Sequence, residues 1–149
     1  VMHWLEQKNE IRLVGEARSL TSTRKVMGGA VPGACMMARS EWLQRQSDGV
    51  QALTDGVVHA LKWLQTAGPA DLIRVLPETY MQGDRSIFLD AFNKCREAFA
   101  TDGLIPPGGA ACVAQAMGQL HAGVGMDPGR LERLWTNRFV ERSKTLLRV

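Results

Sequence analysis

Three histidines and three cysteines are the side chains of this sequence best suited to nucleophilic catalysis or metal binding. The histidines, His3, His59 and His121, have no serine or cysteine nucleophile and no acid at a spacing that suggests a catalytic triad. The cysteines lie far apart and form no Cys-x-x-Cys pair. They are Cys35, Cys95 and Cys112. We therefore predict no catalytic residue, no metal site, no bound cofactor and no enzymatic activity. The cysteines are interpreted as buried free thiols, with a disulfide between two of them left open.

Glycine pairs could cradle a phosphate group, but their spacing does not favour it. Gly28 and Gly29, like Gly108 and Gly109, form neither G-x-G-x-x-G nor G-x-x-x-x-G-K-[ST]. Nucleotide binding is therefore not predicted, and the second pair is interpreted as the start of a helix. The methionines near the first pair could line an adaptable apolar pocket, although core packing is the commoner role. They are Met27, Met36 and Met37.

The excess positive charge lies at the C-terminal end. Residues 130–149 carry six basic and two acidic side chains, a net charge of +4, against +3 for the whole chain. Such a run is usually the solvated face of a helix, which is our interpretation, so we predict no nucleic-acid partner. The alternative is a helical nucleic-acid-binding or regulatory module that uses these cations on phosphates.

Length and composition exclude several classes of protein. The 149 residues are 45% hydrophobic and 22% charged, values that are typical of one globular domain and not of a disordered chain. No apolar run approaches the roughly 18–20 residues that span a bilayer, so we predict no membrane span. The sequence starts at Val1 with neither an initiator methionine nor a leader pattern. We expect it to be a piece of a longer chain.

Two apolar runs predict short strands in the first third of the sequence. Residues 11–17 contain the apolar Ile11, Leu13 and Val14 and resemble a short strand. The polar run 19–25 that follows is predicted to be a loop. Residues 31–38 carry no charge, which suits a strand buried on both faces. Because a lone pair of strands is marginal in water, we expect the rest of the sheet to be encoded upstream.

Helical patterns dominate from residue 40 onward. Ser40 is expected to cap a short helix, and Asp48 with Gln51 resembles a capping box that opens a long one. The expected buried stripe of the long helix is Val50, Leu53, Val57, Ala60, Leu61 and Leu64. Further helices are expected after Gly68, after Asp84 with three phenylalanines in its core face, after Pro107, and from Asp127 to the end of the chain. His59, four residues after Asp55, is expected to form a surface ion pair.

Several stretches together resemble the C-terminal part of periplasmic substrate-binding proteins of ABC importers. They are GGAVPGACMMARSEWLQ, VQALTDGVVHALKWLQTAGPADLI, PETYMQGDRSIFLDAFN and DGLIPPGGA. The group they resemble most is the nitrate/sulfonate/taurine type, which shares its fold with thiamine-precursor-binding relatives. The resemblance implies an α/β fold, the C-terminal portion of a type II periplasmic-binding-protein fold, helix-rich with two short strands. It also implies two domains, with residues 1–27 as the end of the second lobe and the hinge return, and residues 28–149 as the C-terminal part of the first lobe.

The same resemblance implies a function and a site. The chain would be a periplasmic solute-binding component that holds a small anion or heterocycle in an interlobe cleft and passes it to an ABC permease. The expected ligand-binding residues are Met27, Gly28, Gly29 and Pro32, because the glycine pair supplies the backbone freedom that a hinge needs. A thiamine-pyrimidine precursor enzyme on the same fold is a further alternative. Without an N-terminal half the chain is expected to bind substrate weakly or not at all and to self-associate through exposed apolar faces.

Overall fold

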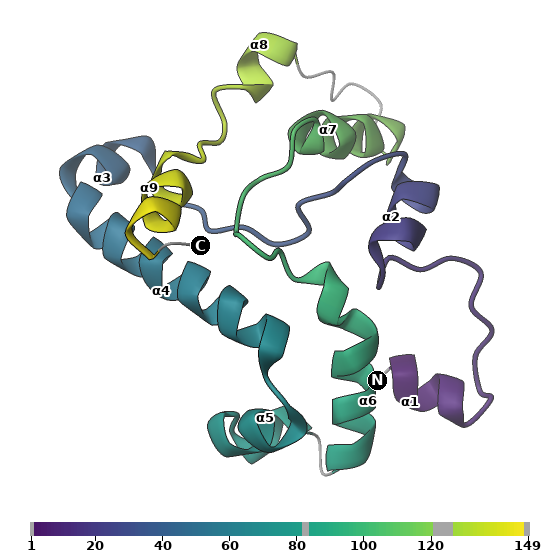
Figure 1. Cartoon of the computed structure of the whole chain (residues 1–149). Helices are drawn as coiled ribbons and strands as arrows, with labels where there is room; N and C mark the ends of the chain where they lie inside the picture. Colours follow the sequence, from purple (N-terminus) through teal and green to yellow (C-terminus); the bar gives the residue numbers. More distant parts are fainter. Residues whose placement is uncertain (1, 82–83, 121–126, 148–149) are drawn as a thin grey trace.

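The computed structural model describes residues 2–81, 84–120 and 127–147, which form helices joined by loops (Figure 1). The α-helices are α1 (Met2–Gln7), α2 (Leu20–Met27), α3 (Ser40–Arg45), α4 (Ser47–Thr66), α5 (Pro69–Val75), α6 (Arg85–Cys95), α7 (Gly109–Leu120), α8 (Pro128–Leu131) and α9 (Arg138–Leu147). Two 3-10 helices, η1 (Glu78–Met81) and η2 (Arg96–Ala98), flank α6. Within these described ranges, no helix combines the length and the hydropathy that crossing a bilayer requires.

The predicted α/β fold with two short strands is wrong. Residues 11–17 and 31–38 are loops, and no strand occurs anywhere in the part of the chain that the structure describes. A strand is stable only when a neighbouring strand takes up its backbone hydrogen bonds, and neither run has such a neighbour among the described residues. Both runs are instead open to solvent, with Val14 99% and Met37 89% exposed. Apolar composition alone was therefore not enough to make them extended pairs in a sheet.

The polar run 19–25, predicted as a loop, forms most of α2. The Ser19 hydroxyl accepts a hydrogen bond from the Ser22 amide at 3.0 Å, and the Ser22 hydroxyl accepts one from the Ser19 amide at 3.2 Å. This reciprocal capping box satisfies two amides at the start of the helix. The helix ends at Met27 and is capped by Gly28, whose φ of 80° places it in the left-handed region.

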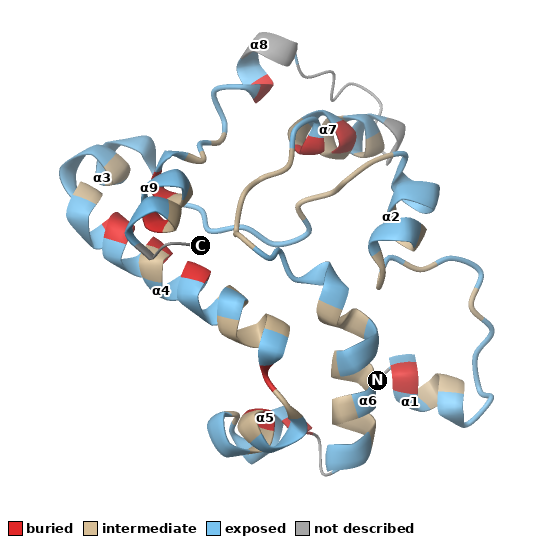
Figure 2. Cartoon of the chain, in the orientation of Figure 1, coloured by how far each residue is buried: buried red, intermediate tan, exposed pale blue. Residues whose placement is uncertain are grey.

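Helices α4 and α9 pack side by side and contain much of the buried surface (Figures 1 and 2). The buried residues of α4 are Val50, Gln51, Thr54 and Val58. This face is rotated from the predicted stripe, because Leu53 and Val57, expected inside, are 54% and 38% exposed. The capping box expected of Asp48 and Gln51 is also absent, since Gln51 is buried against α9.

A network of side chains from both helices, which we call the polar seam, explains the rotation. The polar seam consists of Gln51, Asp55 and Ser143. The Ser143 hydroxyl lies 2.5 Å from Asp55 Oδ1, and Gln51 Nε2 lies 3.0 Å from Ser143 Oγ and 3.0 Å from the Phe139 carbonyl oxygen. Because most buried polar atoms of the seam find their partners across the two helices, with Gln51 Oε1 as the exception, this network favours the face of α4 that lies under α9.

The C-terminal segment, predicted as one continuous helix from Asp127, is divided into α8 and α9. Leu134, expected to be buried, lies between the two helices and is 68% exposed. The side chain of Asn137 bonds both backbone groups of Ile105, accepting from its amide at 3.0 Å and donating to its carbonyl at 3.1 Å. These bonds hold the loop between α6 and α7 against the start of α9.

An arginine connects α4 to the segment after α6. The Arg96 guanidinium donates to the carbonyl oxygens of Leu64, at 2.5 Å, and Ala67, at 2.8 Å, and stacks 4.6 Å from the ring centre of Phe92. Asp84 caps α6 as predicted, accepting from the Ile87 amide at 3.0 Å. However, α6 is not a fully covered core helix, because none of its residues is buried.

Candidate functional site

The four residues expected to bind a ligand lie at the end of α2 and in the loop that follows it. Gly28 caps α2, and its amide donates to the Arg24 carbonyl oxygen at 2.9 Å. Its positive φ would strain any residue with a side chain, although no atom lies within 4 Å of a Cβ placed there. Met27 is 39% exposed, while Gly29 and Pro32 are partly covered.

The start of α7 lies against part of this segment, and we call this contact the glycine junction. It consists of Met27, Gly29 and Pro32 on one side and Gly109 and Cys112 on the other, and the exposed Gly28 lies beside it. The Cys112 thiol donates to the Met27 carbonyl oxygen at 3.0 Å. A Cβ on Gly29 would lie 3.2 Å from Cys112 Sγ, and a Cβ on Gly109 would lie 3.0 Å from Pro32 Cδ. Two glycines thus let the two segments approach closely.

Sequence reasoning placed Gly109 correctly at a helix start but did not connect it with Gly29. The signal that could have linked them is the pair of Gly-Gly steps, at 28–29 and 108–109, each next to a proline or a helix end. Cys112 was expected only as a buried thiol, and it is 9% exposed. The structure describes all three cysteines as free, with Cys95 half-buried and Cys35 exposed, so burial was predicted correctly for Cys112 alone.

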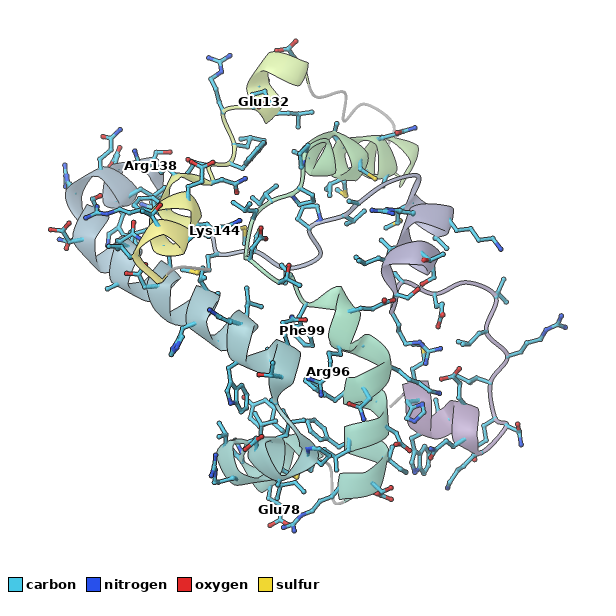
Figure 3. The ribbon with its side chains drawn as sticks, viewed as in Figure 1. Glu78, Arg96, Phe99, Glu132, Arg138 and Lys144 are labelled. Carbon is cyan, nitrogen blue, oxygen red and sulfur yellow. The ribbon has the colours of Figure 1, made fainter. Side chains whose placement is uncertain are left out.

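A small hollow lies on another side of the α7 start. It has a volume of about 70 Å³ and is lined by Gly108, just before α7, by Ala110 and Ala111 in α7, and by Leu131, Glu132 and Trp135 from the α8 region. Figure 3 shows Glu132 beside α8. The indole N–H of Trp135 is buried and has no acceptor in the described part of the chain. The hollow is too small for an organic ligand of the size that typical pockets hold.

The histidines form no catalytic arrangement in the described residues. His3 is 7% exposed, with its Nε2 3.3 Å from Gln7 Nε2 and its Nδ1 3.3 Å from Lys94 Nζ. His59 is exposed as predicted, but its expected partner Asp55 belongs to the polar seam instead. His121 lies outside the described residues. Among the described residues no group of His, Cys, Asp and Glu side chains could hold a metal ion.

The ion pairs beside His3 are structural. The Arg18 guanidinium contacts Glu6 at 2.5 Å and also pairs with Glu16. The hydrogen bond from Arg18 lowers the pKa of the Glu6 carboxyl, and the hydrogen bond to Glu6 raises the pKa of Arg18. These contacts join the loop before α2 to α1 and leave no carboxylate poised as a general base.

The basic C-terminal run is partly engaged within the chain. Lys144 Nζ lies 3.0 Å from Asp102 Oδ2, and Arg138 stacks 4.5 Å from the ring centre of Phe139 (Figure 3). Arg148 lies outside the described residues. Burial pushes the pKa of Asp102 upward, but hydrogen bonds from the Leu104 amide and from Lys144 outweigh it, so the pKa lies below its ordinary value.

This lowered pKa gives a pH-dependent stability. Because the folded state holds the Asp102 carboxylate more firmly than the unfolded state does, its contribution is full above the ordinary carboxyl pKa of 3.8 and is lost as the pH falls below it. We expect Asp102→Asn to show a smaller loss of unfolding free energy than the wild type between about pH 6 and pH 3. Urea unfolding at the two pH values measures this, with the exposed Asp90→Asn as control. An equal slope for Asp102→Asn and the wild type would contradict the assignment.

Comparison with known proteins yields one informative similarity. No family model matches the chain, and no curated protein sequence matches it. A solved structure of a protein from Bordetella bronchiseptica RB50 aligns with 99% of this chain at a TM-score of 0.91 and 29% sequence identity. The alignment covers 46% of the Bordetella protein, so this chain spans less than half of the length of that protein.

Proposed function

We propose that this chain is the helical part of a periplasmic solute-binding component of an ABC importer, which holds a small anion or heterocycle at the glycine junction for delivery to a permease. The single observation that carries the proposal is the convergence at that junction. Met27, Gly29 and Pro32, three of the four residues chosen from the sequence, meet the start of α7, a segment about 80 residues away in the chain. The solute class comes from the sequence resemblance.

The chemistry of the junction suits this role. The Gly28 and Gly109 amides already donate to the Arg24 and Pro106 carbonyl oxygens, so Gly29 is the glycine of this region that could offer its amide to a ligand. Binding of this kind needs no catalytic group, and the described residues contain no arrangement suited to the thiamine-precursor enzyme. The nucleic-acid alternative is weakened because Lys144 is already paired with Asp102.

The exposed apolar surface of the described chain is compatible with the proposal. A self-sufficient, enclosed helical globule would contradict a role as one part of a larger receptor. Many apolar side chains are instead open to solvent, among them Val14, Met37 and Leu134. The structure contradicts the two strands that the resemblance implied, so the proposal rests on the glycine junction and on the sequence resemblance alone.

The test is a titration followed by amide NMR, which detects weak binding. We expect nitrate, taurine, methanesulfonate or an aminopyrimidine at millimolar concentration to shift the amide signals of Gly28, Gly29 and Gly109. Gly29→Val should weaken that binding by about tenfold or more, equivalent to 1.4 kcal/mol, because its side chain would push against Cys112.

The matched control is Gly33→Val, four residues further along the same segment. A Cβ at Gly33 meets no atom within 4 Å, so this variant should bind as the wild type does. Circular dichroism checks that both variants keep their helix content. If none of the four solutes shifts the junction amides, or if Gly29→Val binds as tightly as Gly33→Val, the proposed site is wrong.

A further inference from the structure

The chain exposes far more surface than its mass explains. Its accessible area is 10895 Å² for 16.4 kDa. A compact monomer of that mass exposes about 7,500 Å², so the excess is roughly 3,400 Å². An obligate interface buries about 2,000–5,000 Å² over both partners. The excess is therefore large enough to accommodate a permanent interface with another polypeptide, and Figure 2 shows how little of the ribbon is buried.

A continuous part of this excess is one side of α4, which we call the α4 apolar face. It consists of Leu53, Gly56, Val57, Ala60 and Trp63. At 3.6 residues per turn these five positions fall within one third of the helix circumference. Leu53 is 54% and Val57 38% exposed, and the lower part of the face opens into a groove of about 530 Å³. The polar seam holds α9 on the neighbouring side, so α9 does not cover this face.

No contact among the described residues explains why small residues lie in the α4 apolar face. A glycine inside a helix destabilises it relative to alanine. Gly56 lies in the middle of α4, and a Cβ placed there meets no atom within 4 Å. Ala60, one turn further on, lines the same groove. Adjacent small residues between Leu53 and Trp63 would allow another segment to approach the helix closely.

The Bordetella bronchiseptica protein supplies the candidate partner for the face. The alignment includes 99% of this chain but only 46% of the Bordetella protein. More than half of the Bordetella protein therefore accompanies this fold without a counterpart in the sequence. We propose that the α4 apolar face is the docking surface for a polypeptide equivalent to that unmatched part, which presents an apolar surface to Leu53, Val57 and Trp63. This inference does not depend on the proposed function.

The experiment uses the full 149-residue chain and the unmatched part of the Bordetella protein, produced as a separate polypeptide. Sedimentation velocity and calorimetry should detect a one-to-one complex. Leu53→Asp should weaken it at least about tenfold, because a carboxylate would be buried without a partner. The matched control is Leu134→Asp, the same substitution at a more exposed leucine outside any helix, which should leave the affinity unchanged.

Three outcomes would overturn the proposal. One is the absence of a complex with the wild-type chain. Another is an equal effect of Leu53→Asp and Leu134→Asp, which would mean that the face is not the contact. The third is a wild-type chain that dimerises alone and becomes monomeric with Leu53→Asp, which would make a second copy the occupant. Circular dichroism of each variant confirms that a loss of binding does not come from a loss of helix.

Discussion

Replacing Leu72 by alanine should lower the free energy of unfolding by about 2–5 kcal/mol. Leu72 lies in α5 with only 1% of its surface exposed, which makes it one of the largest fully buried side chains of the described residues. Removing most of its side chain forfeits the transfer free energy of the lost carbons and leaves a cavity. Urea unfolding followed by circular dichroism measures the change.

The matched control for Leu72 is Val75→Ala in the same helix. Val75 is 58% exposed, so its truncation should change the unfolding free energy by less than about 0.5 kcal/mol. Equal effects of the two substitutions would show that α5 is not packed against the rest of the chain. Because the described chain has few fully buried apolar residues, each of them carries an unusual share of its stability.

Removing the hydroxyl of Ser143 should lower the free energy of unfolding by about 1–3 kcal/mol. Ser143 is fully buried, and its hydroxyl connects Asp55, Gln51 and the Phe139 carbonyl. Ser143→Ala takes away almost no volume, so the loss comes from polar groups left without a partner rather than from a cavity. The same urea experiment measures it.

Thr145→Ala provides the comparison for Ser143. Thr145 lies on the same helix, its hydroxyl also donates to the carbonyl four residues earlier, at 3.1 Å, and it is exposed. Water replaces that hydrogen bond when the hydroxyl is removed, so a change near zero is expected. If Ser143→Ala were as mild as Thr145→Ala, the polar seam would not be what fixes α9 on α4.

Sequence patterns predicted where the helices form better than they predicted which residues those helices pack against. Local sequence signals were sufficient where a residue caps or begins its own helix, as Asp84 does for α6 and Pro69 does for α5. The buried face of α4 was missed because periodicity ranks apolar residues, whereas the polar seam depends on Ser143, about 90 residues away. No local pattern contains that contact.

The two predicted strands were wrong because their residues have no partner strand in the described chain. Residues 31–38 have the composition of a buried strand, but a strand exists only with a partner, and the described chain supplies none. Only one side of the glycine junction was predicted from the sequence. Gly28 and Gly29 stood out in the sequence, whereas the approach of Cys112 and Gly109 depends on how α7 folds back.

The end of α6 contacts two parts of the chain that are far apart in the sequence. Arg96, which follows α6, donates to the carbonyl oxygens of Leu64 in α4 and of Ala67 just after it. Lys94, the residue before the last of α6, contacts His3 in α1. The end of α6 therefore joins the first helix of the chain to the end of the long helix α4.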